Sequence, residues 1–170
     1  MSLKAYRSKR KLAISKEPPA TQKKTKSNQL IFVVQEHHAR QLHYDLRLEV
    51  KGVLKSWAVP KKPSMNSKIK RLAIMVEDHP YGYKDFEGVI EEGYGKGTVS
   101  IWDSGTYDVD GQEPKETEKQ ILSGIKKGSF SFSLHGKKLR GSFALVKLKN
   151  SDKNEWLLIK KQKTRPDASR

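Results

Sequence analysis

The chain has 170 residues, 35% of them hydrophobic, and a formal net charge of +16. This length fits one domain with a sizeable core. The sequence contains no cysteine, which excludes disulfides, thiolate metal sites and cysteine nucleophiles. It also has neither an apolar run of membrane-spanning length nor the apolar segment of a signal peptide, so we expect a soluble cytoplasmic protein.

The positive charge predicts a polyanionic partner. Residues 1–28 hold nine lysines and arginines against one acidic residue, which is half of the net charge. We interpret them as a basic, partly irregular arm with one helical turn near Leu3 to Leu12, and residues 29–170 as a single domain. Because this domain is also basic, nucleic acid is favoured over an anionic membrane surface.

Two strands are predicted at the start of the domain. The apolar run Leu30–Val34 is typical of a buried strand, and residues 35–41 are expected to form a loop that contains His37 and His38. Leu42–Val50 alternates between apolar and polar residues, which predicts a half-buried strand. The side chains expected to face the core are Leu42, Tyr44, Leu46, Leu48 and Val50.

Seven further strands and one helix are predicted along the rest of the domain. The strands are expected at Val53–Val59, Arg71–Val76, Phe86–Ile90, Gly97–Trp102, Phe130–Leu134, Phe143–Leu148 and Trp156–Lys160. The helix is expected at Glu113–Lys127, with acidic residues early, lysines late and Gly128 at its end. Regularly spaced short strands with one helix favour an antiparallel barrel or a sandwich.

The polar face of the strand at 42–50 has a chemically specific composition. His43 and Asp45 lie roughly 6–7 Å apart along a strand, and an imidazole with a carboxylate suits Zn²⁺, Mn²⁺ or Fe²⁺. Arg47 comes next on this face and suits a phosphate. His37 is a candidate third ligand if the chain curls back. The same residues are equally typical of an ordinary exposed polar face.

Two other segments have candidate functional patterns. Glu77 and His79 follow a predicted strand, where site residues are common, although a turn with an incidental histidine fits as well. The glycines at 93, 95 and 97 have the spacing of a phosphate-binding loop. Because a strand pattern rather than a helix follows them, we interpret this segment as a tight turn.

Taken in order, these motifs resemble a known family. They include His37-x5-His43-x-Asp45-x-Arg47, Lys55-Ser56-Trp57-Ala58-Val59-Pro60-Lys61, Val76-Glu77-Asp78-His79-Pro80 with Tyr83, and Trp156-Leu157-Leu158-Ile159-Lys160. The chain resembles, over nearly its whole length, the 3′-phosphoesterase module of bacterial and archaeal ATP-dependent DNA ligase D, here as a stand-alone protein. The turn at 90–94 departs from the family pattern, because a proline is replaced and one residue is missing.

The resemblance implies a mainly β fold, a compact antiparallel barrel with one or a few short flanking helices. It implies a metal-dependent enzyme that heals DNA 3′ ends by removing a terminal ribonucleoside and then the 3′-phosphate, which leaves a 3′-OH. The implied metal is Mn²⁺, with Co²⁺ or Zn²⁺ as alternatives. A non-catalytic DNA-end-binding module of a break-repair assembly is the alternative hypothesis.

The resemblance also assigns roles to single residues. The implied metal ligands are His37, His43 and Asp45. The implied catalytic residues are His79, Arg47, Tyr83, Arg71 and Lys61, and the implied substrate-binding residues are Arg47, Lys61, Arg71, Gln35 and Glu77. His79 could act as a proton donor or as a cation that stabilises the transition state.

The resemblance further implies several partners. The substrate would be a DNA 3′ end, on a primer-template that carries a 3′-ribonucleotide or a 3′-phosphate. A separate DNA ligase and polymerase would complete the repair, with an end-binding repair protein as a further candidate. We expect a monomer, without a membrane partner, at the nucleoid of a prokaryotic cytoplasm.

Overall fold

The structure, a computed structural model, describes residues 3–9, 29–91, 93, 95–149 and 153–162. Within these ranges nine strands, two α-helices and one 3₁₀ helix occur. Their order is α1 (Lys4–Lys9), β1 (Leu30–His38), β2 (Leu42–Val50), β3 (Val53–Val59), β4 (Lys70–Pro80), η1 (Tyr81–Asp85), β5 (Gly88–Ile90), β6 (Gly97–Asp108), α2 (Pro114–Lys127), β7 (Ser129–His135), β8 (Arg140–Lys147) and β9 (Glu155–Lys160).

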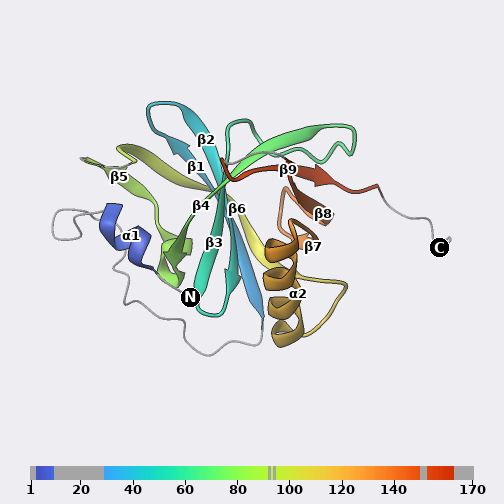
Figure 1. The fold of residues 1–170 in the computed structure, drawn as a ribbon. Coiled ribbons are helices and arrows are strands. Elements are labelled where there is room, and N and C mark those ends of the chain that lie inside the picture. The colour runs from blue at the N-terminus through green and yellow to red at the C-terminus, as the bar shows by residue number, and fades with distance from the viewer. Residues whose placement is uncertain (1–2, 10–28, 92, 94, 150–152, 163–170) are drawn as a thin grey trace.

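Eight of the strands close into an antiparallel barrel (Figure 1). The order is β1-β2-β3-β4-β9-β8-β7-β6, and the pairing of β6 with β1 closes the ring. On its other edge, the long β6 pairs with β7 and with the short β5. The prediction of a mainly β antiparallel barrel with short flanking helices is therefore confirmed. No helix in the described part of the chain is long and apolar enough to cross a membrane.

The main core lies inside the barrel. It includes Leu46 and Leu48 of β2, Trp57 of β3 and Trp156 of β9, all at most 1% exposed. The two indole rings meet edge to face with their centroids 6.0 Å apart, a geometry that aromatic pairs favour. The core therefore joins strands that are distant in the sequence.

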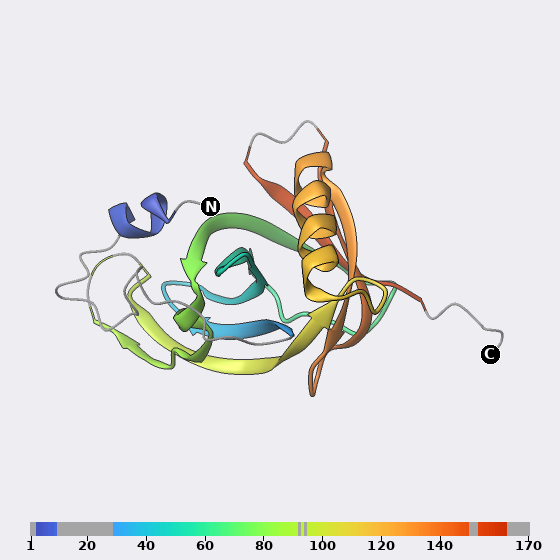
Figure 2. The same ribbon diagram turned by 90° about the horizontal axis from the view of Figure 1, so that it is seen from below.

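Helix α2 packs along β7, on the opposite side of the molecule from α1 (Figure 2). Ile121 is fully buried in the main core, and a side chain at Gly124 would collide with Phe130. The helix ends at Gly128, whose φ of +91° is left-handed and whose N–H donates to the carbonyl of Gly124 at 2.8 Å. The predicted helix is confirmed, with Glu113 as its N-cap residue.

Strands β1 and β2 differ from the prediction. β1 continues to His38, so only residues 39–41 connect the two strands, and the predicted loop at 35–41 was wrong for residues 35–38. Pairing with β2 on one edge and β6 on the other keeps this segment extended. β2 is not half-buried, because Asp45 and Arg47 on its polar face are only 6% and 3% exposed. Leu42, expected in the core, is 43% exposed at the strand's start.

Three later strands also have different bounds. β4 reaches Pro80, so it includes Glu77 and His79 that were expected after the strand. η1 precedes β5, which begins only at Gly88, and β6 continues beyond Trp102. A register shift between Leu54 and Ser56 accompanies the pairing of β3 with the end of β4.

A smaller apolar cluster lies on the opposite face of the sheet from the main core. Its buried members are Tyr6, Leu54 and Tyr83, from α1, β3 and η1. Because Tyr6 is fully buried, α1 is anchored to the barrel at a position within the predicted helical turn. Residues 10–28 of the predicted arm lie outside the described residues, and the division at residue 28 stays a prediction.

We predict that Asp103 supports the hairpin between β7 and β8. Its buried carboxylate accepts hydrogen bonds from the backbone N–H groups of Lys137, Lys138 and Leu139 at 2.9, 3.2 and 2.8 Å. Asp103→Ala leaves these donors without their acceptor and should lower the free energy of unfolding by about 2–4 kcal/mol, measured by urea unfolding.

The matched control is Asp85→Ala. The Asp85 carboxylate is 73% exposed and pairs with Lys84 at 2.7 Å, and an exposed pair contributes less than about 1 kcal/mol. Equal losses for the two variants would contradict the proposed role of Asp103.

Candidate metal centre

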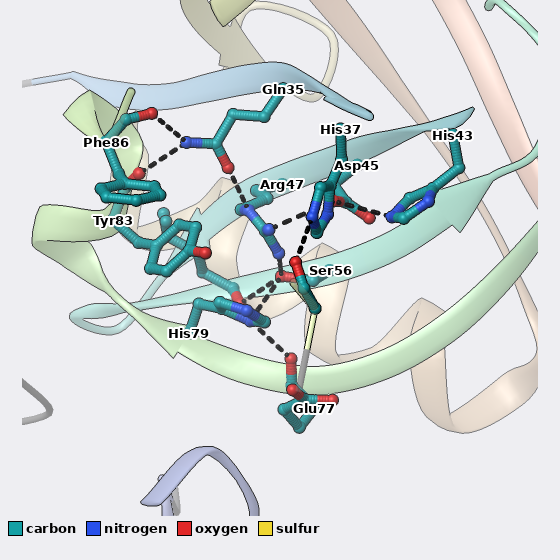
Figure 3. Close-up of polar contacts among 12 residues, drawn as sticks. Gln35, His37, His43, Asp45, Arg47, Ser56, Glu77, His79, Tyr83 and Phe86 are labelled. Carbon is teal, nitrogen blue, oxygen red and sulfur yellow. Dashed lines mark hydrogen bonds and ion pairs between the residues drawn. The ribbon is translucent and has the colours of Figure 1, made fainter. Parts of the chain in front are cut away.

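The candidate site lies on the sheet face that is opposite the main core. In the pairing of β1 with β2, Gln35 stands opposite Asp45 and His37 stands opposite His43. Residues that alternate along a strand share a face, and directly opposed residues of neighbouring strands share it too. The β1–β2 register therefore brings His37, His43 and Asp45 together, as Figure 3 shows.

These three residues have the composition and spacing of a metal site. One ligand atom from each lies within 4.8 Å of the others. Asp45 Oδ2 is 3.3 Å from His43 Nε2 and 3.6 Å from His37 Nδ1. Two imidazoles with a carboxylate suit Zn²⁺, Mn²⁺ or Fe²⁺. The three predicted ligands are therefore grouped at one place on the sheet.

The other nitrogen of each imidazole faces a backbone carbonyl. His37 Nε2 is 2.6 Å from the carbonyl oxygen of Gly95, and His43 Nδ1 is 3.2 Å from that of Gln41. Because a carbonyl oxygen only accepts, each of these nitrogens carries a proton. In the neutral rings, the lone pairs of His37 Nδ1 and His43 Nε2 then face Asp45. This arrangement is typical of metal-binding histidines, so the residues fit a divalent cation.

The charges of the site favour an ionised Asp45. Burial disfavours ionisation of this carboxyl, but the charge of Arg47, with a smaller effect of the neighbouring imidazoles, outweighs burial and holds its pKa well below the usual range. For His43, burial lowers the pKa, but the hydrogen bond and charge of Asp45 raise it above the ordinary value. An ionised carboxylate beside two imidazoles is the form of this site that binds a divalent cation.

Arg47 is the most connected cation of the site. Its Nε donates to Gln35 Oε1 at 2.7 Å, its Nη1 donates to Ser56 Oγ at 2.9 Å, and its Nη2 is 3.5 Å from Asp45 Oδ2. It also lies 4.8 Å from the centroid of the Tyr83 ring. A guanidinium that is held on all sides has little freedom to turn.

The predicted supporting residue Gln35 is fully buried, and its amide oxygen holds Arg47 through the hydrogen bond from Nε. Its amide nitrogen donates to the carbonyls of Tyr83 and Phe86 at 2.7 and 3.1 Å. The orientation of the Gln35 amide therefore leaves its oxygen for Arg47 Nε. Through Gln35, the 3₁₀ helix η1 is tied to strand β1.

His79 is buried beside this network. Its Nδ1 lies 3.0 Å from the carbonyl of Glu77 and 3.5 Å from Ser56 Oγ. Its ring packs edge to face on Tyr83 and Tyr6, with centroid distances of 4.7 and 5.2 Å. The Glu77 carboxylate forms an ion pair with Lys9 of α1 at 3.1 Å. The N-terminal helix thus contacts two predicted site residues.

A cavity of about 230 Å³ opens between these groups. Its lining residues are His37, His43, Asp45, Arg47, Ala58, Val76, Glu77, His79, Tyr83, Ile90 and Gly95. One space is therefore faced by the candidate metal triad (His37, His43 and Asp45), the guanidinium of Arg47 and the imidazole of His79. Such a space can hold a phosphate next to a metal.

Three predicted residues lie outside this lining, and one of them, Gln35, is fully buried. Lys61 is exposed just after β3. Arg71 is partly exposed at the start of β4, and its Nε donates to the carbonyl of Lys62 at 2.8 Å. The structure does not bring their side chains into the cavity, and their proposed contacts with a substrate stay predictions.

Three contributors to the site were not assigned by the sequence. Ser56 accepts from Arg47 and donates to the carbonyl of Leu54 at 3.1 Å, and its place opposite Arg47 depends on the β2–β3 register. Tyr6 belongs to a segment interpreted as an arm. Gly95 contacts His37 through its backbone carbonyl, and every residue type has such a carbonyl, so the sequence does not show this contact.

Residues 35–147 match the family described as the DNA ligase D 3′-phosphoesterase domain. The chain belongs to this family. Among the relatives of the phosphoesterase domain, the multifunctional non-homologous end joining protein LigD of Pseudomonas aeruginosa is 43% identical over 161 residues, covering 93% of this chain and 18% of that protein. The multifunctional non-homologous end joining DNA repair protein LigD of Mycobacterium tuberculosis is 45% identical over 164 residues, covering 95% of this chain and 20% of that protein.

The phosphoesterase domain thus spans about a fifth of these relatives. The family match contains the metal triad, Arg47 and the β4–η1 segment with His79 and Tyr83. Helix α1 precedes the matched range, although the pairwise similarity covers nearly the whole chain.

We predict that His43→Ala abolishes tight divalent-metal binding, because it removes one of three ligands. Titration of metal-free protein with Mn²⁺ in a calorimeter should show an affinity at least about 10-fold weaker than that of wild type. His135→Ala is the control, since His135 pairs with Asp108 on an exposed surface and should bind as wild type does. Unchanged binding by His43→Ala would place the metal elsewhere.

Proposed function

We propose that this protein is a metal-dependent phosphoesterase that heals DNA 3′ ends. It would remove a 3′-terminal ribonucleoside, then the remaining 3′-phosphate, and leave a 3′-OH. The observation that carries the proposal is that the His37–His43–Asp45 cluster and the fixed guanidinium of Arg47 face one cavity. Family membership supports the reaction class. The end-joining function in the relatives' names supports DNA ends as the substrate.

The metal triad supplies the first part of the mechanism. A bound divalent metal stabilises the negative charge of a phosphate as a Lewis acid. His37, His43 and Asp45 would hold it through two neutral imidazoles and one carboxylate, so the centre keeps a net positive charge. Mn²⁺ is the proposed metal, and Co²⁺ and Zn²⁺ suit the same donors.

Arg47 supplies a second positive charge at a fixed position. Its contacts with Gln35, Ser56 and Asp45 hold the guanidinium before any substrate arrives. Charges that are already oriented stabilise a phosphoryl transition state without a cost of reorganisation. We therefore assign Arg47 to the non-bridging oxygens of the scissile phosphate.

The proposed hydrolysis uses water as the nucleophile. Water adds to phosphorus and loses a proton, the bond from phosphorus to the leaving oxygen breaks, and the leaving oxygen takes up a proton. His79 lines the cavity near Arg47 through their shared neighbour Ser56, so it is our candidate for donating this proton or stabilising its charge. Tyr83 packs on both His79 and Arg47 and orients them.

The net charge of +16 supports a nucleic-acid substrate. A healed 3′-OH is the end that a polymerase extends and a ligase joins. A DNA ligase, a polymerase and an end-binding repair protein at a prokaryotic nucleoid therefore stay the predicted partners, and a monomer stays the predicted state.

The decisive experiment uses a labelled primer-template whose primer ends in one ribonucleotide. With Mn²⁺, wild type and His135→Ala should shorten the primer in two steps, first losing the ribonucleoside and then the phosphate. His43→Ala, and wild type with EDTA, should leave the primer intact. Gel electrophoresis resolves both products, and parallel reactions with Co²⁺, Zn²⁺ and Mg²⁺ rank the metals.

The same samples test the non-catalytic alternative, which the basic charge also favours. A DNA-end-binding module would leave the primer intact with every metal, while its affinity for the DNA falls steeply as salt rises. That result for wild type would overturn the enzymatic proposal and support the binding module.

We predict that Arg47→Lys lowers kcat by about 100-fold or more, because a lysine keeps the charge but cannot keep the three guanidinium contacts. The control is Arg140→Lys on β8, because the exposed Arg140 lies outside the cavity lining and its Nε donates to the carbonyl of Gly136 at 3.0 Å. Steady-state cleavage of the primer gives kcat for both variants and for wild type. A normal rate for Arg47→Lys would exclude a specific role for the guanidinium.

A further inference from the structure

The glycine turn before β6 lies against the metal centre. β6 pairs with β1 such that Val99 stands opposite His37. The segment that leads into β6 therefore ends close to this histidine. Gly95 from this segment lines the cavity, and its carbonyl oxygen is 2.6 Å from His37 Nε2. The turn therefore has a contact that a simple connection between strands does not need.

We propose that Gly95 is a positioning residue for the metal ligand His37. Its carbonyl accepts the Nε2 proton, which sets the rotation of the ring and leaves the Nδ1 lone pair aimed at Asp45 Oδ2, 3.6 Å away. Hydrogen bonds to the outer nitrogen of a ligand histidine are known to orient the ring and raise its basicity. The inference rests only on the metal-binding part of the proposed function.

Glycine suits this position. The φ of Gly95 is +81°, a left-handed value that residues with a Cβ seldom adopt. A Cβ here would also lie 3.3 Å from His37 Cε1 and 3.8 Å from Ile90 Cδ1. An added methyl group would thus press on the ring whose orientation the carbonyl sets.

The base of the turn is fixed at a second glycine. At Gly97, with a φ of +147°, a Cβ would collide with the backbone of His38 and Ala39, so the turn approaches the end of β1 closely. The N–H of Lys96 also bonds to the carbonyl of Gly93 at 3.3 Å. These contacts hold the Gly95 carbonyl above His37.

Gly93 provides a matched control within the same turn. Its φ of +82° equals that of Gly95 within a degree, but a Cβ there would have no atom within 4 Å. Gly93→Ala and Gly95→Ala therefore place a Cβ at nearly the same left-handed φ, and only the second also presses on His37. A difference in metal affinity between the two variants therefore reports the contact of the added Cβ with His37.

The first test is calorimetric titration of the metal-free proteins with Mn²⁺, together with thermal unfolding. Gly95→Ala should bind about 10- to 100-fold more weakly than Gly93→Ala, while both melt at similar temperatures. Equal metal affinities for the two folded variants would overturn the proposal.

The second test needs no variant and no metal. In long-range ¹H–¹⁵N spectra of the metal-free wild type, His37 should carry an Nε2 proton that is protected from solvent exchange by its hydrogen bond. A His37 ring protonated only on Nδ1, or an Nε2 proton that exchanges freely, would overturn the inference. This result decides whether the Gly95 carbonyl orients His37 even if the DNA cleavage assay fails.

Discussion

Strand β2 is buried on both faces, although every second residue in it is polar. One face fills the barrel with Leu46 and Leu48, and the other holds Asp45, Arg47 and Glu49 with at most 6% exposure. Buried charges are tolerated only when they are paired and hydrogen-bonded. The polar neighbours of β2 must therefore be donors and acceptors that fit these groups, and this requirement determines the composition of the surrounding strands.

The neighbouring strands satisfy the requirement through their register. Ser56 on β3 stands opposite Arg47, and Gln35 on β1 stands opposite Asp45. The Glu49 carboxylate accepts the N–H of Ile31 at 3.0 Å. The guanidinium of Arg47 and the carboxylates of Asp45 and Glu49 thus have partners on the neighbouring strands. Two of these three groups, Asp45 and Arg47, are also proposed to bind a metal and a phosphate.

The sequence predicted the components of this site better than their positions. The alternation at 42–50 correctly placed His43, Asp45 and Arg47 on one face, because a period of two is a local property of a strand. Residues 35–41 were taken for a loop, since their polar composition says nothing about the strands that pair with them. Ser56 and the Gly95 carbonyl depend on register and on backbone position, neither of which residue types encode. The motif resemblance brought in His37 and His79, which local patterns left open.

The link between β1 and β2 is short, since β1 ends at His38 and β2 begins at Leu42. An inserted or deleted residue there would slip one strand against the other and turn one set of side chains to the other face. Either the apolar side chains would then leave the core, or the charged side chains would leave the candidate site. Length variation among homologues should therefore be rare at this link and commoner in the connection between β3 and β4.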